Sequence, residues 1–307
     1  MKTRPSPIGD GVLLIDKPEG ISSAAAVATV KRTLGGAKVG HLGTLDPFAS
    51  GLLPMCIGEA TKAAPYLNVS DKRYLGVVRL GVESDTLDTT GTLRPGSEVP
   101  PLDEPSLENL SERFRGEIEQ VPPAFSAIKK NGVPMYKLAR SGREVTLNPR
   151  PVVVHDLRLR VIDDEHIGLD VTCSKGTYVR SLARDIGGEL GCGGCLERLR
   201  RTAFGPFRLE DAAPLDALPD ALADGSLQKA VIVLDRALGG MPAFEIDRAT
   251  AAELRLGRQT ALRRLPSPAS ADPGVRAKVL AEGDLVAVLA PTRVGWKLER
   301  IFAPPVR

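Results

Sequence analysis

One carboxylate in a glycine- and proline-rich stretch is the strongest candidate for chemistry in this chain. Asp46 lies within residues 41–54, which read His-Leu-Gly-Thr-Leu-Asp-Pro-Phe-Ala-Ser-Gly-Leu-Leu-Pro. Pro47 disfavours helical backbone at the aspartate, and Gly43 and Gly51 allow a ligand to approach the backbone closely. An aspartate in such a loop can cap a helix or act on a bound ligand. Residue types alone leave both interpretations open.

Two more polar side chains lie on predicted regular elements. Arg180 lies in residues 178–190, whose apolar positions follow a helical period, and Arg184 falls on the same helix face. Tyr74 begins an alternating segment that predicts a strand over residues 74–80. Taken alone, however, such an arginine is usually solvated and such an aromatic is usually a core residue.

Composition restricts the class of protein. The chain has 307 residues, of which 42% are hydrophobic and 26% charged, enough for one large domain and a small one or for two medium ones. No apolar run approaches the roughly 18 residues of a membrane span, and the N-terminus carries no apolar signal region. We therefore expect a cytoplasmic protein without membrane contact.

The cysteines and glycines point to no cofactor. Four cysteines are too few for a disulfide scaffold. Cys192 and Cys195 form a lone C-x-x-C, which a tight Gly-Gly turn explains better than a four-ligand zinc site. The sequence shows neither a P-loop nor a G-x-G-x-x-G motif. We expect no metal and no cofactor.

Charge is uneven along the chain although its sum is only +3. Lysine and arginine gather in residues 129–150 and 198–201, and acidic residues gather in residues 83–119. Such a distribution permits an RNA partner. An ordinary solvated surface is an equally good interpretation of charge alone.

The elements that must position these residues can be outlined. Residues 11–15 and the pair 152–161 and 167–173 are predicted strands, and a helix is predicted over 24–33, with Ser22 or Ser23 as its cap. Residues 40–54 are predicted to be a loop, and residues 81–101 a long connection. Beyond a boundary near Gly239-Gly240, a short helix and several strands predict a compact all-β unit.

The stretch around Asp46 resembles a known catalytic motif. Residues 40–54 are similar to G-H-T-G-[TA]-L-D-P-x-A-[TS]-G-[VLM]-L-P of the bacterial tRNA pseudouridine-55 synthases, the TruB family, with Leu42 in place of the usual threonine. Further segments match in order across about residues 8–210: GVLLIDKP at 11–18, ATK at 60–62, DKRY at 71–74, TLDTTG at 86–91, QVPPAFSA at 120–127, CSKGTYVR at 173–180 and LRRT at 199–202.

The resemblance implies a fold and a division into domains. It implies an α+β protein with a mixed, largely antiparallel sheet flanked by helices, followed by a small C-terminal all-β barrel of the PUA type, for which the match is looser. Residues 1–239 would form the catalytic domain, with a basic mobile loop at about 124–151. Residues 240–307 would form the RNA-binding domain.

The resemblance also implies an activity. Members of this family flip uridine 55 out of the T loop of tRNA and convert it to pseudouridine, breaking the N1–C1′ bond and joining C5 to C1′. Asp46 corresponds to the catalytic aspartate, and Arg180 to the arginine that pairs with it. A two-pronged fork between them would keep the carboxylate ionised and oriented. Tyr74 would stack on the uracil and could help remove the C5 proton, although a phenol with an ordinary pKa of about 10 needs activation to act as a base.

Three further residues would bind the substrate. By the same resemblance, His41 stacks where the flipped base was, and Tyr178 and Leu199 line the base pocket. The enzyme would act on the T arm of tRNA as a monomer, without a required protein partner. Because Leu42 departs from the motif, the resemblance does not determine the detailed conformation of the loop that flips the base.

Two alternatives differ in class. The first is a non-catalytic RNA-binding or RNA-folding protein on the same scaffold, which the joint presence of Asp46, Tyr74 and Arg180 disfavours. The second is a uridine C5 methyltransferase. Such an enzyme needs a nucleophilic cysteine and a glycine-rich turn for S-adenosylmethionine; Cys173 lies on an apolar strand face, and the sequence shows no such turn.

Overall fold

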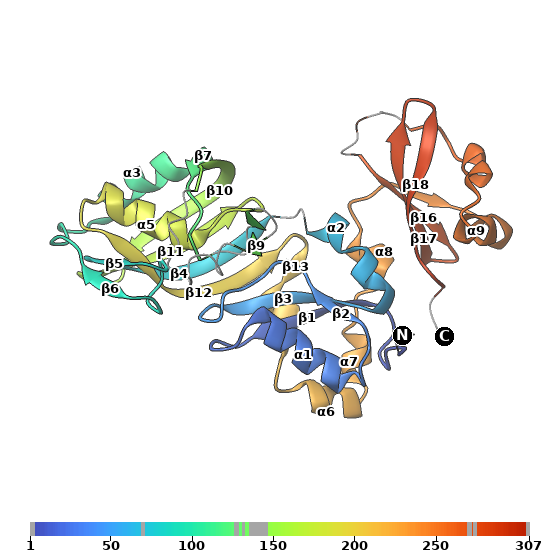
Figure 1. Ribbon diagram of the computed structural model, residues 1–307, viewed down its shortest axis with the longest axis horizontal. Coiled ribbons are helices and arrows are strands. Elements are labelled where there is room, and N and C mark those ends of the chain that lie inside the picture. The colour runs from blue at the N-terminus through green and yellow to red at the C-terminus, as the bar shows by residue number, and fades with distance from the viewer. Residues whose placement is uncertain are drawn as a thin grey trace.

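A mixed β-sheet forms the centre of the computed structural model, which describes residues 4–68, 71–125, 129–130, 133–134, 147–268, 272 and 275–304. Its strands are β1 (Gly11–Lys17), β2 (Val39–His41), β3 (Ser50–Ile57), β4 (Lys72–Leu80), β7 (Gly116–Gln120), β10 (Arg150–Val161), β11 (His166–Cys173), β12 (Gly194–Phe204), β13 (Phe207–Arg208) and β14 (Ala213–Pro214). The order is β14-β1-β3-β12-β4-β11-β10-β7, with β13 beside β12 and β2 beside β3 (Figure 1).

Most neighbouring strands are antiparallel, which confirms the predicted fold class. The parallel pairs in this sheet are β1 with β14 and β12 with β3. The pair β12–β3 joins the two halves of the sheet through only two residue pairs, Arg200 with Ser50 and Arg201 with Gly51. Gly51 has φ +99°, and a Cβ there would lie 2.4 Å from the Arg201 carbonyl oxygen, so this close approach requires glycine.

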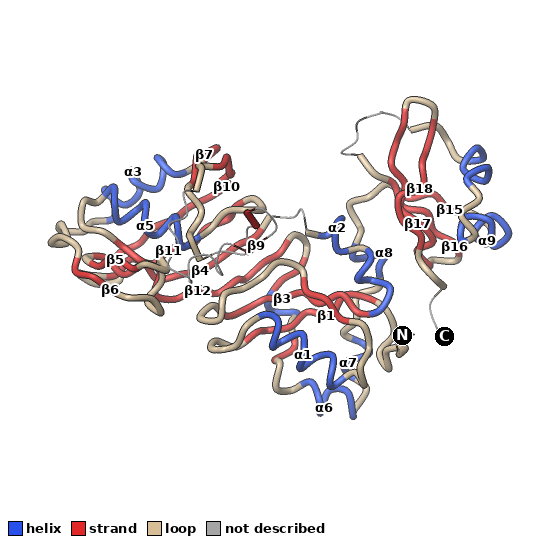
Figure 2. Tube along the Cα trace, viewed as in Figure 1, coloured by secondary structure: helices blue, strands red, loops and turns tan. Residues whose placement is uncertain are grey.

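Helices pack against both halves of the sheet (Figures 1 and 2). The helix α1 (Ser23–Thr33) buries Ala26 and Val30 in the same apolar cluster as residues of β1, while α3 (Glu104–Phe114) and α5 (Val179–Glu189) bury apolar residues against β10 and β12. Ser22 caps α1 by accepting a hydrogen bond from the backbone N–H of Ala25, as one of the two predicted caps. The sheet thereby gains a core on its helical side.

Two sequence predictions were wrong in this sheet. Residues 40–54 were expected to be loop throughout, but Ser50–Ile57 form β3, which is buried along its whole length. A strand buried on both faces lacks polar alternation, and Gly51 and Pro54 are unusual in a strand interior. The strand β12 was not predicted at all, because its arginines at 198, 200 and 201 suggested a surface charge cluster.

Smaller elements complete this part of the chain. The predicted connection 81–101 contains a two-stranded sheet of β5 (Val82–Ser84) and β6 (Leu93–Pro95). The others are η1 (Gly58–Lys62), α2 (Ala64–Leu67), β8 (Lys129–Lys130), β9 (Val133–Pro134), η2 (Leu209–Asp211), α6 (Leu218–Ala223), α7 (Ser226–Lys229) and α8 (Leu234–Ala237). The predicted basic loop at 124–151 lies largely outside the described residues. No helix in the described part of the chain is long and apolar enough to span a bilayer.

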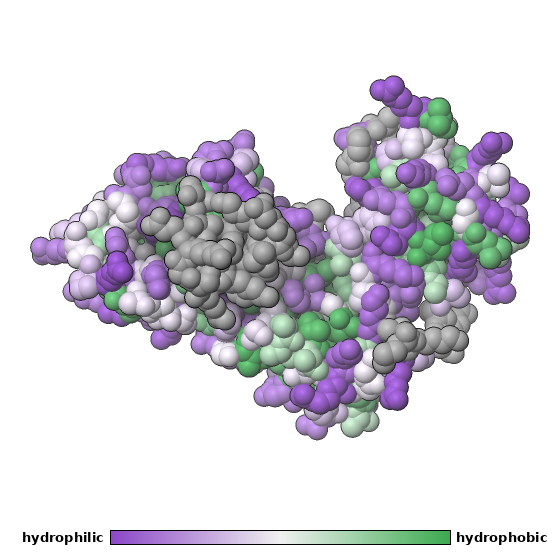
Figure 3. Space-filling model, in the orientation of Figure 1, coloured by the Kyte–Doolittle hydropathy of each residue, from purple (hydrophilic) through white to green (hydrophobic). Residues whose placement is uncertain are grey.

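The C-terminal strands form a separate four-stranded sheet. Its strands are β15 (Ala243–Glu245), β16 (Ala277–Ala281), β17 (Asp284–Thr292) and β18 (Gly295–Ile301), in that order, and it carries α9 (Arg248–Arg255) and η3 (Gln259–Arg264). The pair β15–β16 is parallel. No strand pairing among the described residues closes this sheet into a barrel. Phe302 and Val288 share an apolar cluster with Val12 of β1, and the outline of the molecule is hollowed between this sheet and the rest (Figure 3).

Candidate active site

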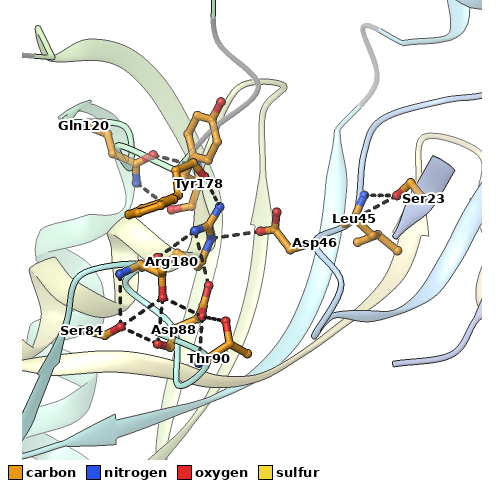
Figure 4. A network of polar contacts seen from close by, with 11 residues as sticks. Ser23, Leu45, Asp46, Ser84, Asp88, Thr90, Gln120, Tyr178 and Arg180 are labelled. Carbon is orange, nitrogen blue, oxygen red and sulfur yellow. Dashed lines mark hydrogen bonds and ion pairs between the residues drawn. The ribbon is translucent and has the colours of Figure 1, made fainter. Parts of the chain in front are cut away.

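The loop that carries Asp46 is fixed on both sides of the aspartate. The Ser23 hydroxyl, at the start of α1, accepts a hydrogen bond from the Leu45 N–H and donates one to the Leu45 carbonyl, both at 2.8 Å (Figure 4). On the other side, the Pro47 carbonyl accepts a hydrogen bond from the Gly20 N–H at 2.8 Å. Lys17 Nζ also lies 3.5 Å from that carbonyl oxygen. These hydrogen bonds fix the backbone on both sides of Asp46.

Arg180 contacts Asp46 directly. Its Nε lies 3.0 Å from Asp46 Oδ2; the arginine side chain is 6% exposed and the aspartate side chain 38%. The contact is not the expected two-pronged fork, because Nη1 donates to the Thr86 carbonyl at 2.7 Å and Nη2 to the Phe125 carbonyl at 2.9 Å. The arginine is thus locked by backbone acceptors, while Asp46 keeps surface that a ligand can reach.

A second carboxylate, Asp88, faces the same arginine and was missed in the sequence analysis. Its Oδ2 lies 3.4 Å from Arg180 Nη1, and its side chain is 5% exposed. The other oxygen accepts hydrogen bonds from the Thr86 hydroxyl at 2.9 Å, the Thr90 N–H at 3.0 Å and the Thr90 hydroxyl (Figure 4). The run Thr-Leu-Asp-Thr-Thr at 86–90 was the available signal, because aspartate and threonine side chains commonly bond to the nearby backbone in a turn.

The electrostatics of Asp46 follow from these neighbours. Burial raises the pKa of Asp46, and the negative charge of Asp88 raises it further. Arg180 and Lys17 oppose that rise. Lys17 is fully buried and donates to the Pro18 and Ile21 carbonyls at 2.7 and 2.8 Å. The site therefore holds a carboxylate of raised pKa against a fixed guanidinium, an arrangement suited to acid–base or nucleophilic chemistry.

Tyr74 lies on β4 directly opposite Arg201 of β12 in the strand register. The tyrosine is 8% exposed and belongs to the main apolar cluster. Burial raises the pKa of Tyr74, the charge of Asp46 raises it further, and the Arg201 guanidinium opposes the rise. Tyr74 is consequently a neutral phenol at neutral pH.

Tyr178 immediately precedes α5, two residues before Arg180. Its N–H donates to Gln120 Oε1 at 2.8 Å, and Gln120 Nε2 donates back to its carbonyl at 3.2 Å (Figure 4). Gln120, at the end of β7, is 2% exposed. This clamp fixes the start of α5, and with it the position of the arginine.

His41 and Leu199 complete the set of predicted site residues. Burial and the neighbouring Arg201 lower the pKa of His41, so its ring is neutral at neutral pH. Leu199 lies two residues before Arg201 on β12 and is 7% exposed. The structure thus brings Asp46 and Arg180 into contact and places Tyr74 and Leu199 on the adjacent strands β4 and β12. His41 lies at the end of β2, directly before the Asp46 loop.

Leu42 departs from the family motif and is a core residue. It is fully buried among apolar side chains that include Leu52 and Phe204. Its backbone N–H donates to the Pro54 carbonyl at 2.8 Å. The substitution therefore strengthens the packing beneath the loop and adds no polar group to the site.

The Cys192–Cys195 segment is the tight turn that was predicted. Gly193 has φ +79°, and the N–H groups of Cys192 and Gly193 both donate to the Gly187 carbonyl. Both cysteines are buried and free. The described residues contain no group of three potential metal ligands.

Comparisons with known proteins identify relatives of this chain. A family model described as "TruB family pseudouridylate synthase (N terminal domain)" matches residues 31–179, and one described as "tRNA pseudouridylate synthase B C-terminal domain" matches residues 180–239. The chain is 46% identical over 258 residues to tRNA pseudouridine synthase B of Azoarcus sp. (strain BH72), covering 83% of this chain and 84% of that protein. It is 43% identical over 293 residues to the protein of the same name from Burkholderia mallei (strain NCTC 10247), covering 93% and 96%.

A solved structure shows the same fold. The chain superposes on one in the crystal structure of a Cbf5-Nop10-Gar1 complex with a TM-score of 0.72 and 25% identity, covering 99% of this chain and 90% of that one. The fold, with the family matches and with a loop aspartate paired to an arginine of α5, defines a pseudouridine synthase, an isomerase of uridine in RNA. Within that class, the chain belongs to the TruB family.

Proposed function

We propose that this enzyme converts uridine 55 in the T loop of tRNA to pseudouridine, with Asp46 as the catalytic carboxylate. The observation that carries the proposal is the 3.0 Å contact between Asp46 and Arg180, which joins two separate segments that resemble the family. Its relatives are named tRNA pseudouridine synthase B, which supports tRNA as the substrate. The T loop as the target follows from the family resemblance.

The reaction rearranges bonds without gain or loss of atoms. The N1–C1′ bond breaks, and its electron pair leaves with the uracil. The Asp46 carboxylate acts on the sugar, which is left electron-poor. The ring turns, C5 bonds to C1′, the C5 proton departs and N1 gains a proton. Arg180 holds the aspartate charged and oriented during these steps, because an opposite charge favours the ionised form.

The base must leave the folded RNA loop to reach Asp46. Unstacking costs a few kcal/mol, which contacts in the pocket must offset. The neutral ring of His41 is suited to stack where the base was, since it carries no charge to desolvate. Tyr74 supplies a flat face for the flipped uracil, and Tyr178 and Leu199 line its pocket.

The two parts of the chain divide the work in this proposal. Residues 1–239 form the catalytic domain, and residues 240–307 form a PUA-like domain that contacts the RNA. The hollow between the C-terminal sheet and the rest of the molecule offers a concave face to the T arm (Figure 3). The enzyme acts as a monomer in the cytoplasm and needs no protein partner.

A T-arm RNA carrying tritium at C5 of its target uridine tests the proposal. The wild-type enzyme should release tritium and leave pseudouridine at that position, as mapped by mass spectrometry after derivatisation. Asp46→Asn should bind the RNA with nearly unchanged affinity and release no tritium. Normal release by this variant would refute the assignment of Asp46.

The same assay separates the alternatives. Binding without product by the wild-type chain would indicate a non-catalytic RNA-binding protein. A methylated uridine, formed only when S-adenosylmethionine is added, would indicate a methyltransferase. Product at a uridine outside the T loop would retain the reaction and overturn the proposed target.

A further inference from the structure

A gap in the strand pairing of β3 lies beside the Asp46 loop. One edge of β3 pairs with β2 at residues 55–57 and with β12 at residues 50 and 51, while β1 lies along the other edge. The Leu52 carbonyl falls between those two pairings, and Arg201 Nε donates a hydrogen bond to it at 2.7 Å. Because a buried carbonyl needs a donor, the Arg201 side chain here takes the place of a neighbouring strand.

The same guanidinium reaches the other end of the loop. Its Nη2 donates to the Gly43 carbonyl at 3.1 Å. The N–H groups of a guanidinium form a rigid planar fork, so the carbonyls of residues 43 and 52 are held against one side chain. Asp46 lies between these two residues in the sequence. Arg201 therefore ties together the two ends of the loop that carries the carboxylate.

Arg201 is an expensive residue to place at this position. It is fully buried, and its guanidinium carbon lies 5.4 Å from the centroid of the Phe204 ring. Its Nη1 has no hydrogen-bond partner within the described residues. Burying a charged group with an unsatisfied donor costs free energy that an apolar side chain would not cost. The two bonds to the loop are what a guanidinium adds here, and neither an apolar side chain nor the single ammonium of a lysine reproduces both.

We propose that Arg201 is a positioning residue that ties both ends of the Asp46 loop to β12 and so sets the distance between the Asp46 carboxylate and the base pocket. The inference rests on the proposed function, in which Leu199, two residues before Arg201 on β12, lines that pocket. Asp46 has to reach the sugar while the base lies against β12. A displacement of the loop by about 1 Å is enough to slow such a reaction by about 10²-fold.

The test separates the rate of the bound complex from the binding of RNA. A T-arm RNA with tritium at C5 of the target uridine is used at saturating enzyme, and its affinity is measured separately. Arg201→Met keeps a long side chain without donors, and it should lower the single-turnover rate by about 10²-fold with nearly unchanged RNA affinity. Arg201→Lys keeps the charge and should restore only part of that rate. Full restoration by lysine would overturn the proposal, because charge alone would then be sufficient.

Phe204→Leu is the matched control for a merely structural role. Phe204 is fully buried against the same guanidinium, but its side chain makes no hydrogen bond to the loop. The variant should unfold at lower denaturant concentration than the wild type, as Arg201→Met should, and yet keep a single-turnover rate near wild type. Equal rate losses in the two variants, or a loss in Arg201→Met confined to RNA affinity, would contradict the positioning role.

Gly43→Ala is a second arm that leaves Arg201 in place. Gly43 has φ +69°, and a Cβ there would lie 3.0 Å from Phe204 Cε2 and 3.4 Å from Arg201 Nη1, so the change disturbs the same contact from the loop side. It should also lower the rate, and adding Arg201→Met should cost little more, because residues that act as one unit are not additive. Full additivity would contradict the proposal. If the wild-type enzyme itself released no tritium, the proposed function would fail, whereas an active Arg201→Met would overturn this inference alone.

Discussion

Asp88 meets the Arg180 guanidinium at 3.4 Å while Asp46 meets it at 3.0 Å, so one cation is shared by two carboxylates. Both Asp88 and Arg180 are almost fully buried, whereas Asp46 retains 38% of its side-chain surface. The buried carboxylate holds the arginine, and the arginine in turn holds the carboxylate that substrate can reach. Orientation of Asp46 therefore depends on a residue that lies behind the site.

Replacement of Asp88 by asparagine should lower the rate and shift its pH dependence. The loss of one anchor on Arg180 should reduce the single-turnover rate by about 10-fold to 10²-fold, less than Asp46→Asn. Since the charge of Asp88 raises the pKa of Asp46, its removal should lower that pKa. The acid limb of the pH–rate profile should therefore move to lower pH.

Glu98→Gln is a suitable control for Asp88→Asn, because Glu98 is an exposed acidic residue of the same region. It should leave both the rate and the acid limb unchanged. A shift of the acid limb to higher pH in Asp88→Asn would contradict the electrostatic account of this site.

Gln120→Ala should weaken the start of α5. The change removes the acceptor of the partly buried Tyr178 N–H, which costs about 1 kcal/mol of unfolding free energy. We also expect a reduced single-turnover rate, since the clamp positions the segment that leads to Arg180. Chemical denaturation and the tritium assay measure the two effects. Glu119→Ala, at an exposed neighbouring position, should change neither the stability nor the rate. If Gln120→Ala were as stable and as active as the wild type, the proposed clamp would be contradicted.

Leu42→Thr restores the residue that is usual in the family motif, and we expect it to be harmful to stability. Leu42 is fully buried in an apolar cluster, so a hydroxyl there loses contacts and lacks a partner. The unfolding free energy should fall by about 1–3 kcal/mol. Pseudouridine formation below the melting temperature should stay near wild type. A faster reaction in this variant would show that position 42 acts on the substrate.

Lys72→Met tests the cost of a second buried cation. Burial and the nearby Arg201 lower the pKa of Lys72 from 10.5 to about 8. A lysine whose pKa falls on folding destabilises the folded state fully below pH 8, and this penalty disappears as pH rises from about 8 to 10.5. The shift corresponds to about 3 kcal/mol, from which the lost contact with the Phe204 ring subtracts about 1 kcal/mol.

Denaturation of Lys72→Met and wild type at several pH values measures this effect. The variant should be more stable by about 2 kcal/mol at pH 7, and its advantage should shrink as pH rises from 8 to 10. An advantage that grew over that range would reverse the sign of the argument. Lys229→Met, at an exposed lysine, should show no such pH dependence.

Local sequence signals predicted the elements with regular patterns. The alternation in β10 and β11, the period of α5 and the Ser22 cap are properties of short segments, and the structure confirms them. The strand β3 failed this approach because a strand in the middle of a sheet is apolar throughout and has no alternation to detect. Strand β12 was missed because Arg201, a charged residue, lies on the face of the strand that points into the core.

Individual site residues could be predicted from the sequence, but most of the contacts between their side chains could not. Family resemblance pointed to Asp46 and Arg180 although they lie far apart in the sequence, and the structure brings them into contact. Asp88 and Gln120 fell within matched segments but received no role, since their importance comes from which atoms they face. Arg201 had been counted as surface charge, because no local rule tells which residue of a strand meets a buried tyrosine.

The narrow junction between β3 and β12 has a consequence for how this enzyme can fail. Only two residue pairs bridge the halves of the sheet. In the proposed mechanism Asp46, directly before β3, acts on the ribose, and Tyr74, on β4 in the other half, meets the pyrimidine. A mutation at the β3–β12 junction would leave each half of the sheet folded and able to bind RNA. It would nevertheless separate the residues that act on the sugar from those that act on the base, so that they no longer act in one transition state. Inactivation without unfolding is the failure expected from mutations that wedge these strands apart.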